Sequence, residues 1–219
     1  MVPRNLPANA DSFVGRAPEI EQILALLQSG RMVSLVGPGG CGKSRLAVEA
    51  VWRALDAGPI EVRFVDLSSC VDAGQAARAL ALACGVREHA GQDLEESIDA
   101  ALRGRDTLLF FDGCEHLVEP AARLFGRLLS THPNLVLLVT TRERLRVPGE
   151  ALFEVKPLAV PAGATLAEIR RTPSVRLFLD RARAVRPDLE ESDEILPAVA
   201  DICRRLDGIP LALELAAAR

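Results

Sequence analysis

The chain has 219 residues, of which 49% are hydrophobic and 26% are charged, and its formal net charge is -4. This composition is typical of a soluble globular protein, and the length is enough for one large domain or for a medium domain and a small one. The negative net charge and the 4% of aromatic residues, with no tyrosine, argue against surfaces for phosphate backbones or stacked bases. We therefore expect no direct binding of nucleic acid by this chain.

The cysteines and the apolar segments bear on the compartment. The five cysteines are scattered without a C-x-x-C pair, which indicates reduced thiols rather than a disulfide frame or a zinc site. Residues 1–6 contain no apolar stretch of the kind found in signal peptides. No segment reaches the roughly 18 apolar residues of a membrane helix. These features predict a cytoplasmic protein without membrane contact.

Short apolar runs alternate with helical patterns over the first part of the chain. Strands are predicted at five apolar runs, residues 32–36, 62–65, 108–111, 135–139 and 152–155. Apolar residues recur at helical spacing in the stretches between them, at residues 46–54, 76–83, 93–102 and 119–129. This alternation predicts an α/β fold of the P-loop NTPase type, a three-layer parallel sheet with helices on both faces.

The pattern changes after Lys156. We expect residues 1–157 to form a nucleotide-binding domain and residues 158–172, with their prolines and no strand pattern, to form a linker. Helical spacing returns in residues 173–219, which predicts a small all-helical subdomain. The final run 214–219 has no glycine or proline stop signal, so we expect a subdomain cut short from a longer protein.

One segment fits the motif G-x-x-x-x-G-K-[ST] in full and lies between a predicted strand and a predicted helix. Its glycines let the backbone wrap around phosphate oxygens, and the following helix begins with N–H groups that favour an anion. The expected nucleotide-binding residues are Gly37, Pro38, Gly39, Gly40, Cys41, Gly42, Lys43, Ser44 and Arg45. We expect Lys43, on an exposed loop, to neutralise the β- and γ-phosphates, Ser44 to bind Mg²⁺, and Cys41 to face outward. The alternative is an ordinary glycine-rich turn.

Two charged residues follow later strands. Asp112 ends the apolar run 108–111, where an aspartate can hold Mg²⁺ through water, although it could also cap a turn. Arg142 follows the strand predicted at 135–139 and could reach the γ-phosphate. It could equally be a solvated loop charge, because Arg144 and Arg146 follow it closely.

Five motifs, in this order, resemble those of NB-ARC domains, which belong to the STAND class of signal-transduction ATPases. They are Phe13–Arg16, the segment Gly37–Ser44, Leu109–His116, Thr140–Arg142 and Gly208–Ala212. The likeness covers residues 5–219 and is nearest to the NB-ARC modules of large bacterial transcriptional regulators of the LuxR and SARP type. It implies an ATP/ADP switch that is closed and inactive with ADP, and that opens and often self-associates with ATP. It also implies effector domains within a longer protein.

The resemblance assigns further roles. Val14, Gly15 and Arg16 correspond to the segment that lines the adenine pocket, and Pro210 to the proline that closes over the nucleotide. Arg142 corresponds to the sensor arginine. Ordinary roles as a turn and as helix caps are compatible with these assignments.

The chain departs from the family at Gly113, where members commonly carry Asp or Asn. The missing carboxylate predicts a weak ATPase, and it predicts faster hydrolysis for Gly113→Asp. Glu115 is the nearest alternative group to orient the attacking water, unless it caps the following helix.

The leading interpretation is therefore a regulatory switch with ATP/ADP and Mg²⁺ as cofactors. A metabolic P-loop kinase or transferase would need an acceptor pocket and an arginine-rich lid, for which residues 142–146 are the sole candidate. A GTPase is disfavoured because the chain has no N-K-x-D motif. A structural adaptor without nucleotide is disfavoured by the intact Lys43, Ser44 and Asp112.

Overall fold

The computed structural model describes residues 6–7, 12–87, 93–163 and 165–219. These residues form two compact units. The first contains Ala17–Gly37 and Lys43–Glu154, and the second contains Pro38–Gly42 and Val155–Arg219 together with residues 12–16. No helix in the described ranges is both long enough and apolar enough to cross a membrane.

In the described part of the first unit, five parallel strands form one sheet. They are β1 (Met32–Val36), β2 (Glu61–Asp66), β3 (Thr107–Asp112), β4 (Leu135–Thr141) and β5 (Glu150–Glu154). Their spatial order is β2-β3-β4-β1-β5, and each neighbouring pair is parallel. β3 is buried from Thr107 to Phe111, as expected for a strand covered on both sheet faces. The predicted parallel sheet is confirmed.

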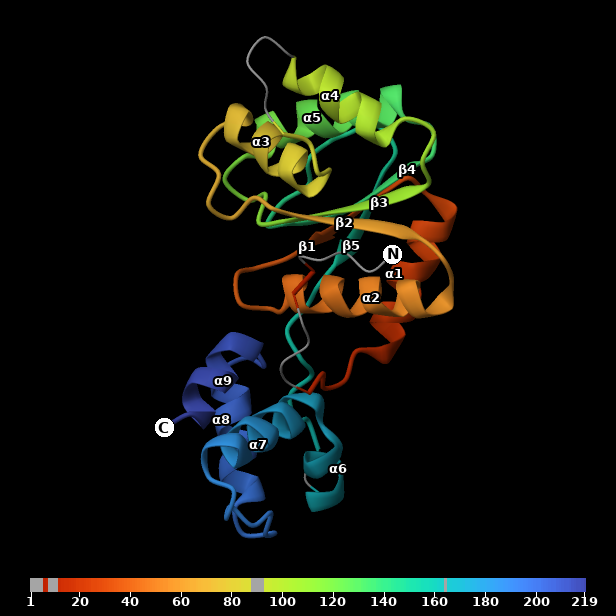
Figure 1. Cartoon of the computed structure of the whole chain (residues 1–219). Helices are drawn as coiled ribbons and strands as arrows, with labels where there is room; N and C mark the ends of the chain where they lie inside the picture. Colours follow the sequence, from red (N-terminus) through yellow and green to blue (C-terminus); the bar gives the residue numbers. More distant parts are fainter. Residues whose placement is uncertain (1–5, 8–11, 88–92, 164) are drawn as a thin grey trace. The chain divides into compact units, whose positions relative to one another are not determined.

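Helices cover both faces of this sheet (Figure 1). On one face lie α1 (Ala17–Ser29) and α2 (Lys43–Ala57), and on the other lie α3 (Ala73–Ala83), α4 (Leu94–Leu102) and α5 (Val118–Thr131). The side chains of α3, α4 and α5 form one apolar core with β3, in which Leu109, Phe111 and Phe125 are fully buried. The three-layer α/β fold predicted from the alternating pattern is thus confirmed.

The helices of the second unit pack around a separate apolar core. Within the described residues they are α6 (Leu166–Arg171), α7 (Pro173–Val185), α8 (Leu196–Arg205) and α9 (Pro210–Ala217). α6 lies inside residues 158–172, for which the sequence suggested a linker. Its first turn is held by a capping box, in which Thr165 and Glu168 bond to each other's backbone N–H. The prolines and glycines that flank this capping box favour a loop, which explains why the sequence suggested a linker here.

The turn between α8 and α9 depends on a glycine. Gly208 has a φ of 64°, its N–H donates to the Cys203 carbonyl at 3.1 Å, and its own carbonyl accepts from the Leu158 N–H at 2.9 Å. A Cβ at this position would lie 2.0 Å from the carbonyl oxygen of Leu158. Both the backbone conformation and the close approach of Leu158 therefore require glycine here.

We predict that Gly208→Ala lowers the free energy of unfolding by about 3 kcal/mol, because strain at positive φ and the clash with Leu158 add together. Gly104→Ala is the matched control. Gly104 has a φ of 69° and no atom within 4 Å of a built Cβ, so strain alone should cost about 1–2 kcal/mol. Urea unfolding followed by circular dichroism measures both losses. Equal losses would show that the contact with Leu158 relaxes at no cost.

Candidate functional site

The predicted phosphate-binding segment connects a strand to a helix. β1 ends at Val36 and α2 begins at Lys43, so residues 37–42 form the loop between them. Gly40 and Gly42 have φ values of 76° and 88°, which favour glycine. The first turn of α2 presents backbone N–H groups and the positive end of the helix dipole at the end of this loop. The structural context predicted for the motif is therefore present.

Two side chains of this segment are placed differently from the expectation. Lys43 is not exposed: it is only 7% accessible, and its Nζ donates to the Gly37 carbonyl at 3.0 Å. Its alkyl stem can be covered by the fold because the ammonium group finds an oxygen partner within the loop. Cys41 does not face outward either, because it is fully buried. A free cysteine behaves as a small apolar residue, so its burial follows ordinary packing.

Asp112 lies at the carboxyl end of β3, beside β4. The Thr140 hydroxyl donates to Oδ1 of Asp112 and accepts the Gly113 N–H at 3.0 Å. The Cys114 N–H also donates to the Thr140 carbonyl, at 3.1 Å. Thr140 therefore fixes both the Asp112 carboxylate and the backbone that follows it. No role was predicted for Thr140, because choosing between Thr140 and its neighbour requires the register of β3 and β4.

The two predicted catalytic residues lie together in the first unit. Nε of Arg142 is 3.8 Å from Oε1 of Glu115. The Arg142 side chain is 66% accessible, whereas that of Glu115 is 26% accessible. The second oxygen of Glu115 is buried and has no hydrogen-bond partner among the described residues. The pair places a carboxylate and a guanidinium next to β3 and β4, and their catalytic roles stay predictions.

Gly113 is not a position from which a carboxylate is simply missing. It has a φ of 81°, and a Cβ built on it would lie 2.9 Å from both the backbone N and the Cα of Ser68. A contact this short to backbone atoms cannot be relieved by turning a side chain. This turn admits only glycine without strain, so the structure opposes the expectation that Gly113→Asp would supply a useful carboxylate.

The thiols near Asp112 are inert. Burial, then the charges of Asp112 and Glu115, raises the pKa of the Cys114 thiol. Burial also raises the pKa of Cys70, with further contributions from Asp66 and Asp72. Thiols with raised pKa values stay protonated at neutral pH and are poor nucleophiles. Cys70 and Cys114 are free and buried, and we assign them a packing role.

The donor set in the first unit suits one metal. Ser44, on the first turn of α2, and Asp112 offer hard oxygen atoms, which Mg²⁺ prefers. The described residues contain no group of three or more His, Cys, Asp or Glu that could hold a metal by themselves. Mg²⁺ commonly uses one or two protein ligands together with water and phosphate oxygens. The residues present fit Mg²⁺ bound with a nucleotide.

The second unit brings Arg16 to the loop residues Pro38–Gly42. Arg16 has a positive φ of 62°, and its Nη2 donates to the Lys156 carbonyl at 2.7 Å. Its Nη1 lies 3.9 Å from the point that a Cβ on Gly42 would occupy. The preceding residue, Gly15, lies close to Pro173 at the start of α7. Of the segment predicted to line the adenine pocket, Arg16 thus lies beside the loop.

The start of α9 also contacts this loop. The Leu211 N–H donates to the Gly40 carbonyl at 3.2 Å. Pro210 is the first residue of α9, and its Cγ lies 3.8 Å from the point that a Cβ on Gly42 would occupy. A proline at a helix start has no N–H to satisfy, so the next N–H is the one that reaches the loop. The predicted residue Pro210 is therefore near residues 38–42.

Sequence relatives cover most of the chain. It is 35% identical over 208 residues to an uncharacterized protein of Mycobacterium tuberculosis, across 95% of this chain and 50% of that protein. It is 38% identical over 199 residues to a protein of the same organism that is provisionally named an HTH-type transcriptional regulator, across 89% of this chain and 21% of the relative. The chain thus spans half the length of the first relative and about a fifth of the second.

Two solved structures share the fold. CDC6P of Pyrobaculum aerophilum has a TM-score of 0.64 and 18% identity, covering 99% of this chain and 61% of its own. A STAND protein with a tetratricopeptide repeat sensor from Pyrococcus horikoshii has a TM-score of 0.61 and 18% identity, covering 97% of this chain and 31% of its own. At this level of identity the likeness concerns the fold alone.

A family model assigns the chain directly. The model described as an AAA ATPase domain matches residues 12–140, which is more than half of the chain. The matched range contains the loop 37–42, Lys43, Asp112 and Thr140, whose arrangement is described above. The chain therefore belongs to the AAA ATPase domain family.

Proposed function

We propose that this chain is the ATP/ADP-binding switch module of a signal-transduction or transcriptional regulator, of the NB-ARC type within the STAND class. The observation that carries the proposal is the hydrogen bond from the Leu211 N–H to the Gly40 carbonyl. It joins the first turn of α9 to the loop that would hold phosphates. A loop that only bound nucleotide would not need this partner.

The nucleotide would be held by the residues predicted for it. The N–H groups of residues 37–45 and the Lys43 ammonium would bind the phosphates, and Ser44 and Asp112 would hold Mg²⁺ directly or through water. When bound, Mg²⁺ neutralises phosphate charge. Thr140 keeps the Asp112 carboxylate in place for this task. Val14, Gly15 and Arg16 are our candidates for the adenine side.

The switch would act through residues 38–42. A change of phosphate contacts in this loop alters the position of the Gly40 carbonyl, and Leu211 on α9 is bonded to that carbonyl. We propose that ADP favours the inactive state and that ATP favours an open state competent for self-association or for release of effector domains. The relative named as a regulator is about five times longer than the region it shares, which leaves room for such domains in that protein.

Hydrolysis would be slow in this proposal. Glu115 is the candidate for orienting the attacking water, and Arg142 for contacting the γ-phosphate. Each is engaged with the other at 3.8 Å, so the carboxylate has to leave a cationic partner before it can act on a water molecule. A switch benefits from slow turnover, because the ATP state then lasts long enough to be read.

We predict that Lys43→Met lowers the affinity for ADP by at least about 10-fold, because hydrogen bonds from a charged donor to phosphate are lost. Methionine keeps an apolar stem of similar length where Lys43 is buried, so the fold should persist. Isothermal titration with Mg²⁺ and ADP measures the affinity, and circular dichroism reports the fold. An unchanged Kd with a normal spectrum would refute the phosphate-binding role of the loop.

We predict that Asp112→Asn weakens nucleotide binding much more with Mg²⁺ than with EDTA, because its carboxylate acts through the metal. Asp66→Asn is the matched control. Asp66 lies opposite Asp112 in the register of β2 and β3, but its carboxylate is engaged by the N–H and hydroxyl of Ser68. Titrations of both variants under the two conditions test this. Equal losses for Asp112→Asn with and without metal would indicate a structural role only.

We predict that Gly113→Asp lowers the free energy of unfolding by about 2 kcal/mol or more, and that it does not raise kcat. The positive φ and the backbone of Ser68 both oppose a Cβ at this position. Urea unfolding and a steady-state ATPase assay are the two measurements. A variant as stable as the wild type with faster hydrolysis would contradict the steric explanation and restore the missing-carboxylate hypothesis.

A further inference from the structure

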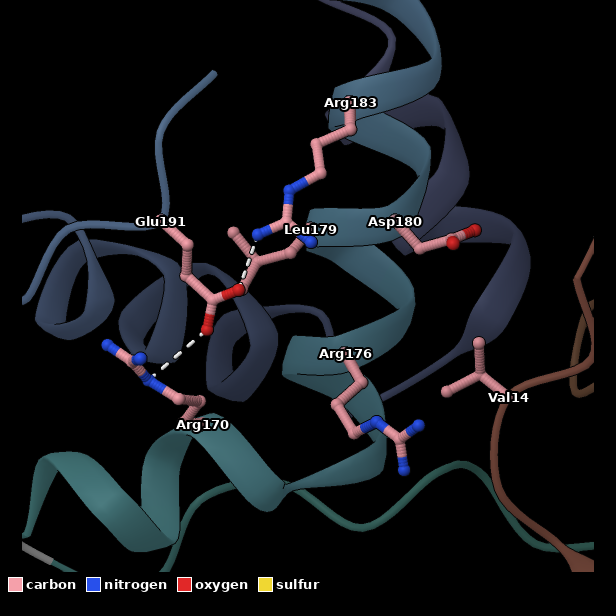
Figure 2. Close-up of a pocket in the computed structure, with 7 residues that line it drawn as sticks. All are labelled: Val14, Arg170, Arg176, Leu179, Asp180, Arg183 and Glu191. Atoms are coloured by element: carbon pink, nitrogen blue, oxygen red, sulfur yellow. Dashed lines mark hydrogen bonds and ion pairs between the residues drawn. The ribbon is translucent and has the colours of Figure 1, made fainter. Parts of the chain in front are cut away.

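The second unit contains a cavity of about 300 Å³, of which the proposed function uses only Val14 (Figure 2). It lies along α7, between α6 and the segment that precedes α8. The lining residues are Val14, Arg170, Arg176, Leu179, Asp180, Arg183 and Glu191. Sites for small molecules typically measure about 300–1,000 Å³, so this cavity has room for a small ligand only.

One end of the cavity already holds a carboxylate. Oε1 of Glu191 lies 3.2 Å from Nε of Arg170, and its other oxygen is paired with Nη2 of Arg183. Figure 2 shows the carboxylate between the two guanidinium groups. Arg170 is also bonded to Asp193, at 2.8 Å. The arginines at this end are therefore paired with carboxylates of the chain itself.

At the other end lies Arg176, which pairs with no carboxylate in the described part of the chain. The Arg176 side chain extends on the side of Val14 (Figure 2), and its guanidinium has no hydrogen bond or ion pair with any residue that the structure describes. The nearby carboxylate of Asp180 accepts from the Ser12 hydroxyl at 2.7 Å and from Nη1 of Arg181 at 2.6 Å. Arg181 also pairs with Glu214, at 3.2 Å, so it is shared by two carboxylates. Arg176 is an exposed guanidinium with no bonded partner among the described residues.

Apolar surface lies next to this cation. Val14 and Leu179 line the same cavity, and Leu179 is 3% accessible. Arg176 is itself exposed, and the half-buried Val14 supplies most of the apolar surface beside it, because Leu179 is largely covered. A guanidinium in this setting binds carboxylate or phosphate oxygens through two parallel hydrogen bonds.

We propose that this cavity binds a small organic oxyanion, with the Arg176 guanidinium on its carboxylate or phosphate group and its compact apolar body against Val14 and Leu179. The site contains none of residues 37–45 and shares only Val14 with the residues proposed for the nucleotide, so we expect it to bind its ligand in addition to the nucleotide. Benzoate and phenyl phosphate are suitable probes, because they share a ring and differ in the oxyanion. Benzamide is the neutral counterpart of benzoate.

The test is a titration of the full chain with each probe, followed by ligand-observed NMR, with and without saturating Mg²⁺ and ADP. We expect at least one of the two oxyanions to bind in both conditions and benzamide to bind at least about 10-fold more weakly. The oxyanion that binds more tightly identifies the preferred head group. Arg176→Gln should weaken that binding by about 10-fold or more. Arg171→Gln should leave it unchanged, because Arg171 is exposed and does not line the cavity.

Several results would overturn the proposal. Failure of both oxyanions to bind, equal binding of benzamide, or full affinity in Arg176→Gln would each refute charge recognition by Arg176. Displacement of the probe by ADP would assign the cavity to the nucleotide site instead. Lys43→Met separates the two proposals, because it should weaken ADP binding by at least about 10-fold and leave probe binding unchanged. The titration without nucleotide remains decisive even if ADP does not bind.

Discussion

Parallel pairing of β1, β3 and β4 is the constraint on which the first unit's chemistry depends. It brings the carboxyl ends of all three strands to one edge of the sheet, although their sequences are far apart. The loop 37–42 leaves β1 at this edge, Asp112 ends β3 there, and Thr140 stands near the end of β4. An antiparallel strand in any of these places would move its polar residue to the opposite edge.

Residue types at this edge of the sheet are restricted by close contacts among the ends of β2, β3 and β4. The Thr140 hydroxyl donates to the Asp112 carboxylate and accepts from the Gly113 N–H. It therefore acts both as donor and as acceptor toward two consecutive residues at the end of β3. The backbone then turns at Gly113 against Ser68, which follows β2. The segment that follows β2 thereby limits the side chains that the turn after β3 can carry.

Much of the architecture could be predicted because buried parallel strands appear as apolar runs, and the motif proposed to hold phosphate has a fixed spacing. What could not be predicted depended on how the backbone turns and on which residues it brings together. The burial of Lys43 requires a carbonyl six residues earlier to turn inward, and the clash at Gly113 requires Ser68. The short helix α6 was hidden by flanking prolines and glycines, although its capping box was readable. The arginines that line the cavity could not be distinguished in the sequence from ordinary solvated charges. Charged residues at helical spacing do not show which partners their side chains bind.

The division of the chain into units has a mechanical consequence. Pro38–Gly42 groups with the helices, whereas Gly37 and Lys43 on either side group with the sheet. The polypeptide therefore passes from one body to the other and back within a single short loop. Glycines at 37 and 42 stand at the two crossings, where their backbone torsions are the least restricted of any residue type. A ligand held by residues 38–42 would therefore restrict the torsions at both crossings.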